Sequence, residues 1–259
     1  MPWPMTRRAL LTLPWLALGT GHTHAERTVL VTGHPGFAPF SFQQGEQVDG
    51  ILPEVARRLL RSLSLQPQLR ALGPWARVQQ AARQGQVDLL AGLYDSPERR
   101  EYLDFLNPAV MGNDVVVVVR RGRAFPYRRW EDLVGRRLGR VHGDRYNEEF
   151  ERFLEQRRDQ IEVDAALNPE LNFRKLLLGR IDAIVYSRWV SERLSRQLGL
   201  HQELEFLPIP VFTGQLHLAI ARSSGSLLEL KPRLETQLQE LLRDGQLLPQ
   251  LIRHYTATP

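Results

Sequence analysis

The stretch VDLLAGL at residues 87–93 decides the fold that this sequence predicts. Its apolar residues are nearly continuous, which is typical of a parallel strand that is buried on both faces. Residues 75–84 before it have a helical pattern, and residues 66–72 before those have the pattern of a strand. This order of strand, helix and strand predicts a βαβ unit in a mostly parallel sheet.

The same alternation extends in both directions. Residues 28–32 form a β-branched run, and residues 51–63 place their leucines on one helical face. The run VVVVV at residues 115–119 predicts a fully buried strand, and Arg120–Gly122 follow it like the exit from one unit into another. From Trp130 the alternation restarts, with strands expected at 137–141, 161–165 and 182–186 and helices at 147–157, 169–178 and 189–198.

The last third of the chain breaks this pattern. Pro208 and Pro210 interrupt it, residues 215–221 form another strand suited to carrying the chain back, and Ser226 is suited to cap one long final helix. That helix carries an apolar stripe of Leu227, Leu230, Leu234, Leu238, Leu241 and Leu242. We therefore predict an α/β protein of two Rossmann-like lobes with mostly parallel sheets, joined by two crossings.

Residues 1–25 have the features of a secretory signal peptide. Arg7 and Arg8 precede an apolar stretch at residues 9–18, and small and polar residues lead to a cleavage site after Ala25. The apolar stretch is shorter than the roughly 20 residues that a membrane span needs. The chain has no cysteine, which excludes disulfides, thiolate metal sites and a lipid-modified N-terminal cysteine. We expect export to the periplasm without a lipid anchor, by either the general or the twin-arginine route.

Composition and motifs argue against several other classes of protein. The net charge of +5 comes from 34 basic and 29 acidic residues that are interleaved, so a mixed-charge surface is expected and no nucleic acid partner. His34 and His142 lack further ligands at metal-binding spacing, so we predict no metal and no cofactor. Phosphate-loop, dinucleotide, HExxH and GxSxG motifs are absent from the sequence.

Three segments together resemble one protein family. They are GHPGFAPFSF at 33–42, QVDLLAGLYDSPERREYLDF at 86–105 and LVGRRLGRVHGD at 133–144. The chain resembles the periplasmic solute-binding proteins that serve ATP-driven importers of polar amino acids, bacterial extracellular solute-binding protein family 3. The resemblance implies a Venus-flytrap, type II periplasmic binding architecture. Lobe 1 is then discontinuous, at 26–118 and 216–259, lobe 2 is inserted at 119–215, and a ligand sits between them.

The resemblance implies that Arg99 binds a ligand carboxylate, and a planar guanidinium with two parallel donors fits that role. The alternatives are a surface arginine or the use of Arg100. Phe37 and Trp75 match positions where relatives place rings against the ligand, whereas an ordinary aromatic residue of an α/β protein is core.

Further site residues follow from the same matching. Gly92 and Tyr94 lie where relatives use backbone groups and a small hydroxyl residue, so the tyrosine narrows the pocket or supplies a phenol donor. Gly143 and Asp144 match the glycine and threonine that open a helix and meet the carboxylate. Asp144 repels an anion there, and a role as helix cap is the alternative.

This sequence departs from its relatives at the positions that bind the amino group of the ligand. Relatives that bind α-amino acids carry an aspartate where this chain has Ser187, preceded by Tyr186, and another acidic position is His34 here. A buried ammonium needs a partner charge or several acceptors. Either Asp144 takes that role or the ligand lacks the amine.

We therefore predict a monomeric periplasmic protein that binds a small polar solute, an amino acid or related carboxylate, for the membrane subunit of an ABC importer. It is not expected to be an enzyme. The alternatives are a small dehydratase or lyase-like enzyme, with Asp144 or Glu54 as general acid, and a ligand-sensing partner of a membrane receptor.

Overall fold

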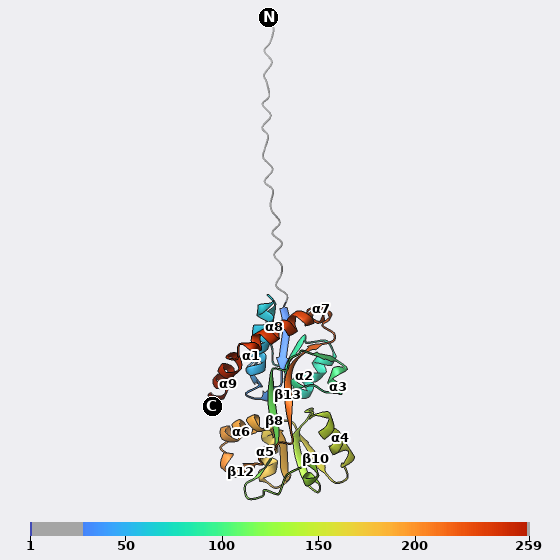
Figure 1. Cartoon of the computed structure of the whole chain (residues 1–259), viewed down its shortest axis with the longest axis vertical. Helices are drawn as coiled ribbons and strands as arrows, with labels where there is room; N and C mark the ends of the chain where they lie inside the picture. The colour runs from blue at the N-terminus through green and yellow to red at the C-terminus, as the bar shows by residue number, and fades with distance from the viewer. Residues whose placement is uncertain (2–27, 258–259) are drawn as a thin grey trace.

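The computed structural model describes residue 1 and residues 28–257, so the predicted signal peptide lies outside the described residues except for Met1. Two lobes are stacked along the long axis of the molecule, and two long strands run through both of them (Figure 1). These strands are β8 (Met111–Arg120) and β13 (Phe212–Ala221). The predicted α/β class with two lobes and two crossings is confirmed.

Lobe 1 is built on a parallel core of three strands. β1 (Thr28–Gly33) lies between β5 (Gln66–Leu69) and β6 (Leu89–Tyr94) and is parallel to both. The remaining elements are β2 (Gly36–Phe37), β3 (Ser41–Gln44), β4 (Gln47–Asp49), α1 (Ile51–Ser62), α2 (Trp75–Arg83), α3 (Pro97–Arg100) and β7 (Leu103–Phe105). α1 buries Val55, Ala56, Leu59 and Leu60 completely, the face that its sequence pattern predicted.

Lobe 2 repeats this plan. β9 (Arg137–Val141) lies between β10 (Glu162–Ala166) and β11 (Ala183–Ser187), again all parallel. The helices and remaining elements are α4 (Glu148–Gln156), α5 (Pro169–Leu177), α6 (Arg188–Gln197), β12 (Leu204–Phe206) and the short 3-10 helices 130–133 and 201–203. All six strands and helices expected between residues 137 and 198 are present within one or two residues of their predicted ends.

The two crossings are paired with each other. Met111–Val115 of β8 pair antiparallel with Phe212–Leu216 of β13, after which β8 joins β11 in lobe 2 and β13 joins β6 in lobe 1. One continuous sheet order therefore runs through both lobes, β10-β9-β11-β8-β13-β6-β1-β5. The predicted lobe boundaries at 118/119 and 215/216 fall within these two strands, and the division at those residues stays a prediction.

The valine run of β8 is buried on both faces, as its sequence predicted. Val116 and Val118 pack into one hydrophobic cluster, and Val115, Val117 and Val119 pack into another. Because successive side chains of a strand point to opposite faces, one run of valines serves both clusters.

The prediction of one long final helix is wrong. The segment forms three helices, α7 (Gly225–Leu228), α8 (Lys231–Arg243) and α9 (Leu247–Ala257), and α7 follows Ser224, not the predicted cap Ser226. Pro232 explains the first break, since a proline inside a helix has no amide hydrogen for the preceding turn. It is accommodated in the first turn of α8 instead. Leu227, Leu234 and Leu238 are still fully buried.

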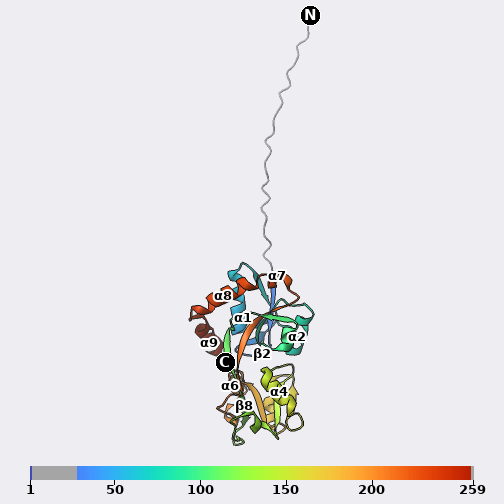
Figure 2. The same cartoon turned by 45° about the vertical axis from the view of Figure 1, so that its right-hand side comes forward.

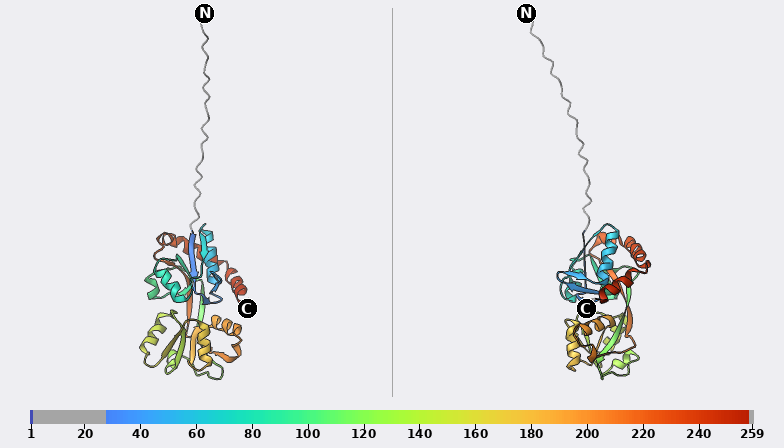
Figure 3. Two further views of the ribbon diagram at one scale, coloured as in Figure 1. Left: turned by 180° about the vertical axis from the view of Figure 1, so that it is seen from behind. Right: turned by 90° about the vertical axis from the view of Figure 1, so that its left-hand side faces the viewer.

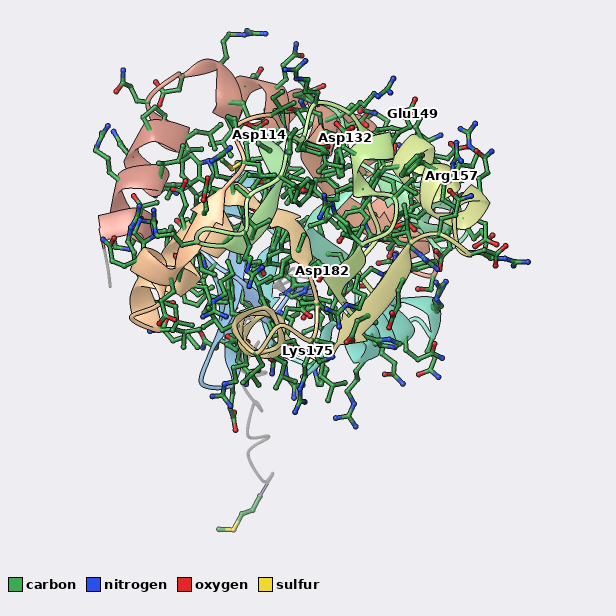
Figure 4. The ribbon with its side chains drawn as sticks, turned by 90° about the horizontal axis from the view of Figure 1, so that it is seen from below. Asp114, Asp132, Glu149, Arg157, Lys175 and Asp182 are labelled. Atoms are coloured by element: carbon green, nitrogen blue, oxygen red, sulfur yellow. The ribbon has the colours of Figure 1, made fainter. Side chains whose placement is uncertain are left out.

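The lobes are connected by the two crossings, and the far end of lobe 2 carries charged side chains of both signs. Turned views show the lobes as two bodies joined by β8 and β13, with α9 descending along lobe 1 toward lobe 2 (Figures 2 and 3). At the far end of lobe 2, acidic and basic side chains such as Asp182 and Lys175 are interspersed (Figure 4). In the described part of the chain, every helix is too short or too polar to cross a membrane.

Candidate functional site

The ends of four parallel strands face the junction between the lobes. In lobe 1, β1 ends at Gly33 and β6 ends at Tyr94; in lobe 2, β9 ends at Val141 and β11 ends at Ser187. Ligands of open α/β sheets bind beyond the carboxyl ends of the strands, where loops rather than ladder hydrogen bonds shape the surface. The segments after these strands enclose one cavity from both sides.

The cavity has a volume of about 30 Å³. One water molecule needs roughly 10–15 Å³ measured in this way, so the lobes are closed over little free space. Nine of the ten predicted site residues line the cavity: His34, Phe37, Trp75, Gly92, Tyr94, Arg99, Asp144, Tyr186 and Ser187. The tenth, Gly143, lines the neighbouring crevice that shares Asp144 and Arg145 with this cavity. The structure brings these residues together, and their roles toward a ligand stay predictions.

Arg99 is buried, with 3% of its surface exposed. It lies on α3, where the Ser96 side chain accepts a hydrogen bond from the Arg99 amide, and its Nη1 donates to the Tyr94 carbonyl at 2.8 Å. Burial lowers the pKa of Arg99 from its ordinary value, but a guanidinium remains charged in proteins. Arg100, the predicted alternative, is exposed and pairs with Asp95.

Aromatic rings form a continuous wall beside this guanidinium. The His34 ring lies 5.1 Å from the Trp75 ring and 5.6 Å from the Phe37 ring, measured between centroids, and Phe37 meets Tyr186 of lobe 2 edge to face at 6.1 Å. The Arg99 guanidinium carbon is 5.8 Å from the Trp75 ring centroid. Phe37 and Trp75 therefore contribute both to the core and to the cavity. Phe40 is fully buried, whereas Phe42 is only partly buried against the core.

Four buried polar atoms around the cavity have no hydrogen-bond partner within the described residues. They are His34 Nε2, Trp75 Nε1, Arg99 Nε and the Tyr186 hydroxyl. His34 Nδ1 accepts a hydrogen bond from the Gly36 amide, so the neutral ring carries its hydrogen on Nε2. All four atoms are thus able to donate. Buried donors without acceptors cost about 1–3 kcal/mol each, which indicates a site built for an acceptor-rich molecule.

Asp144 supplies the only carboxylate among the cavity-lining residues. Its side chain is 15% exposed, and its Oδ1 lies 3.5 Å from His34 Nε2 across the cleft. The predicted helix start at Gly143 and Asp144 is wrong, as is the capping role of Asp144. α4 begins at Glu148, and Asn147 caps it by accepting a hydrogen bond from the Phe150 amide. Gly143 instead forms a turn with φ of 83°, which favours glycine.

Ser187 has structural partners. Its hydroxyl accepts from the Val190 amide as the cap of α6 and donates to Asn113 Oδ1 at 2.8 Å. The side-chain amide of Asn113 in turn donates to the Tyr94 hydroxyl. These hydrogen bonds link Tyr94 of lobe 1, Asn113 of the β8 crossing and Ser187 of lobe 2. Asn113 is 2% exposed and was not predicted; its position two residues before a buried valine run was the available signal.

Two of the hydrogen bonds at the rim join the lobes. Arg145 of lobe 2 donates to Glu98 of lobe 1 at 2.7 Å, and Gln79 of lobe 1 donates to the Gly143 carbonyl of lobe 2 at 2.9 Å. Within lobe 1, Arg83 also donates to Glu98. Partial burial acts to raise the pKa of Glu98, but the hydrogen bonds and charges of Arg145 and Arg83 outweigh it and lower this pKa. Sequence analysis missed Gln79, Glu98 and Arg145 because their partners across the cleft are distant in the chain.

Comparison with known proteins agrees with this architecture. The model of the bacterial extracellular solute-binding proteins, family 3, matches residues 29–256. The L-cystine-binding protein TcyJ of Escherichia coli (strain K12) is 26% identical over 166 residues. The match covers 63% of this chain and only 60% of that relative's length. The membrane-bound lytic murein transglycosylase F of Shewanella halifaxensis (strain HAW-EB4) is 33% identical over 102 residues, 39% of this chain and 21% of that protein.

A solved structure extends the comparison to nearly the whole chain. An ancestral arginine-binding protein bound to arginine has a TM-score of 0.72 and 21% identity, and the match covers 90% of this chain and 99% of that one. The fold is the Venus-flytrap fold of type II periplasmic binding proteins that the sequence predicted. This chain belongs to the bacterial extracellular solute-binding proteins, family 3.

Proposed function

We propose that this protein binds a small amino acid or a related carboxylate between its lobes and delivers it, unchanged, to the membrane subunit of an ABC importer. The observation that carries the proposal is the buried guanidinium of Arg99, whose Nε has no partner within the described residues and which lines the interlobe cavity. A desolvated charge of this kind is costly unless a counter-ion joins it. A ligand carboxylate is that counter-ion.

The charges of the cavity support an α-amino acid. Three charged residues line the cavity, and one of them, Arg145, is paired with Glu98. The other two, Arg99 on lobe 1 and Asp144 on lobe 2, lie too far apart to form an ion pair with each other. A zwitterion satisfies both, with its carboxylate on Arg99 and its ammonium on Asp144, the counter-ion role left open by the sequence. TcyJ and the ancestral protein are named for binding amino acids, which favours the same class of ligand.

Closure follows from the placement of these two groups. Because they come from different lobes, a ligand that contacts both stabilises the closed form relative to the open one. The paired strands β8 and β13 are the two connections that absorb the rotation. The ligand thereby sets the population of the closed shape, which is the shape that a receiving membrane subunit distinguishes.

The proposed location is the periplasm, and the proposed state is a monomer. The basic and apolar pattern of residues 1–25 supports export. The family consists of bacterial extracellular solute-binding proteins.

An enzyme on this fold is the second candidate, since part of the chain is similar to a lytic transglycosylase. Of the two acids considered for a general acid, Glu54 lies on α1, is paired with Arg57 and Arg58, and does not line the cavity. Asp144 remains, and it lines the same cavity as Arg99 and the donors of His34, Trp75 and Tyr186. This arrangement favours binding over chemistry. Turnover of peptidoglycan fragments by the purified protein, lost in Asp144→Asn, is the result that favours the enzyme.

A thermal-shift screen over amino acids, small carboxylates and amines tests the proposal. Ligand at a hundredfold excess over Kd adds about 2.7 kcal/mol to the free energy of unfolding, which raises the Tm by about 5–10 °C for a protein of this size. We expect such a shift with carboxylate-bearing ligands and none with simple amines. A library in which nothing shifts the Tm contradicts the proposed function.

A further inference from the structure

We propose that Tyr94 limits the size of the ligand, so that the cleft selects amino acids with short side chains, of the size of glycine, alanine or serine. This inference rests on the proposed function and adds the ligand class. It starts from the position of Tyr94 as the last residue of β6, where its side chain lines the cavity and reaches the crossing between the lobes.

The Tyr94 ring is packed against Gly214 of β13, which leaves room for the ring because it has no side chain. A Cβ atom added to Gly214 lies only 2.3 Å from Tyr94 Cε1 and 2.7 Å from Cδ1, far inside van der Waals contact. Gly214 pairs with Asn113 of β8 in the antiparallel register, and Asn113 donates its hydrogen bond to the Tyr94 hydroxyl. The ring and the hydroxyl of Tyr94 are therefore both held by one residue pair of the crossing.

A third contact comes from lobe 2. The Phe212 ring meets the Tyr94 ring edge to face, with centroids 5.7 Å apart and planes at 70°. Asn113 also accepts from Ser187, so the atoms that fix Tyr94 are themselves fixed. A side chain held by packing on one face, an edge contact and a hydrogen bond has no free direction except into the cavity.

The Tyr94 backbone is tied to Arg99 within lobe 1. The Tyr94 carbonyl accepts the hydrogen bond from Arg99 Nη1 at 2.8 Å, and both residues belong to the β6–α3 segment of lobe 1. Opening of the cleft enlarges the space toward Asp144 on lobe 2 more than the space beside this segment. A ligand whose carboxylate binds Arg99 therefore meets the Tyr94 ring close to that carboxylate.

The chemistry of the ligand follows from the walls. Arg99 and Asp144 take the two charged groups. The closed cavity of about 30 Å³ holds only about two or three water molecules, so any amino acid requires some opening of the cleft. We infer that a long side chain requires in addition that the Tyr94 ring leaves its contacts with Gly214 and Asn113. Amino acids with long aliphatic or long cationic side chains should therefore bind more weakly.

The test compares glycine, alanine and serine with leucine, glutamine and arginine by isothermal titration calorimetry. We expect the unaltered protein to bind at least one short amino acid ten times more tightly than any long one. Tyr94→Ala should weaken that preference at least tenfold by admitting leucine or glutamine. Tyr94→Phe keeps the ring and should keep the preference within threefold. Tyr127→Ala, a buried tyrosine of lobe 2 outside the cavity, controls for general loss of stability.

A second variant, at Gly214, tests the size limit set by the Tyr94 ring even if Tyr94→Ala does not fold. Gly214→Ala pushes the ring into the cavity and should weaken alanine binding at least tenfold, while Gly214→Ala with Tyr94→Ala should bind like Tyr94→Ala alone. If long amino acids bind the unaltered protein as tightly as short ones, the size limit is wrong although solute binding stands. If no amino acid or carboxylate binds any variant, the proposed function fails, and the size limit with it.

Discussion

The two faces of the cleft differ in how their polar groups are held. On lobe 1, Arg99 is bonded to Ser96 and to the Tyr94 carbonyl, and His34 accepts from Gly36 while its carbonyl accepts from Ser41. These contacts lie within lobe 1 and do not depend on closure. On lobe 2, the turn that carries Asp144 finds its partners across the cleft, because Gly143 accepts from Gln79 and Arg145 donates to Glu98.

This difference indicates that the two lobes have different roles in binding. We expect the guanidinium and the rings of lobe 1 to keep their arrangement when the cleft opens, so lobe 1 should determine whether a ligand binds at all. The contacts of Gly143 with Gln79 and of Arg145 with Glu98 require closure, so lobe 2 should determine how strongly the closed form is favoured. Substitutions on lobe 1 should therefore act on affinity more strongly than substitutions at the closing contacts.

The largest expected effect is that of Arg99→Ala on lobe 1. Loss of one partner of a buried charge pair costs about 2–5 kcal/mol, a weakening of Kd by about 30- to 5,000-fold. Arg100→Ala, the exposed neighbour that pairs with Asp95, should change Kd less than twofold. Calorimetry on both variants measures the difference, and equal effects of the two contradict the role of Arg99.

Asp144→Asn on lobe 2 should have a smaller and more selective effect. A hydrogen bond to a charged group contributes about 1.5–3 kcal/mol, so amino acid binding should weaken by about 10- to 150-fold. A matched carboxylate without the amine should bind Asp144→Asn at least as tightly as it binds the unaltered protein, because the substitution removes the repulsion between Asp144 and the anion. Asp159→Asn, an exposed acid of the same lobe, is the control. Equal weakening of both ligands means that Asp144 does not hold the ammonium.

The smallest effect should come from the rim pair of Glu98 and Arg145. The pKa of Glu98 is lowered in this closed form, with burial opposed and outweighed by Arg145 and Arg83. A carboxyl of lowered pKa favours the closed form at pH above its ordinary pKa, and this contribution is lost as the pH falls through the lowered value. An exposed pair of this kind contributes about 0.2–1 kcal/mol, which is at most about fivefold in Kd.

The ratio of Kd for Glu98→Gln to Kd for the unaltered protein measures this contribution. We expect the variant to bind a few times more weakly at pH 7 and the ratio to approach one as the pH falls through the lowered pKa of Glu98. High salt should reduce the ratio at pH 7 in the same way, because the ions screen the pair. A ratio that is independent of both pH and salt shows that the rim pair does not assist closure.

Much of the fold could be predicted from sequence because its signals are local. The apolar run at 87–93 and the valine run at 115–119 indicate buried strands by themselves. The final helices could not be placed, since a stripe of leucines fits one helix or three, and Pro232 decides between them. In the site, Arg99 and Asp144 were recognisable through the family resemblance, and for Arg99 its position shortly after a predicted strand agreed with that role.

The sequence by itself determined the alternation of strands and helices, and its resemblance to a family pointed to Arg99, Trp75 and Asp144 as residues of one cleft. Only the tertiary structure decided which residues hold them there. Asn113, Gly214 and Glu98 act through partners on other elements. Such contacts form between segments far apart in the chain, so no local pattern records them. They exist only when two lobes and two crossings pack together.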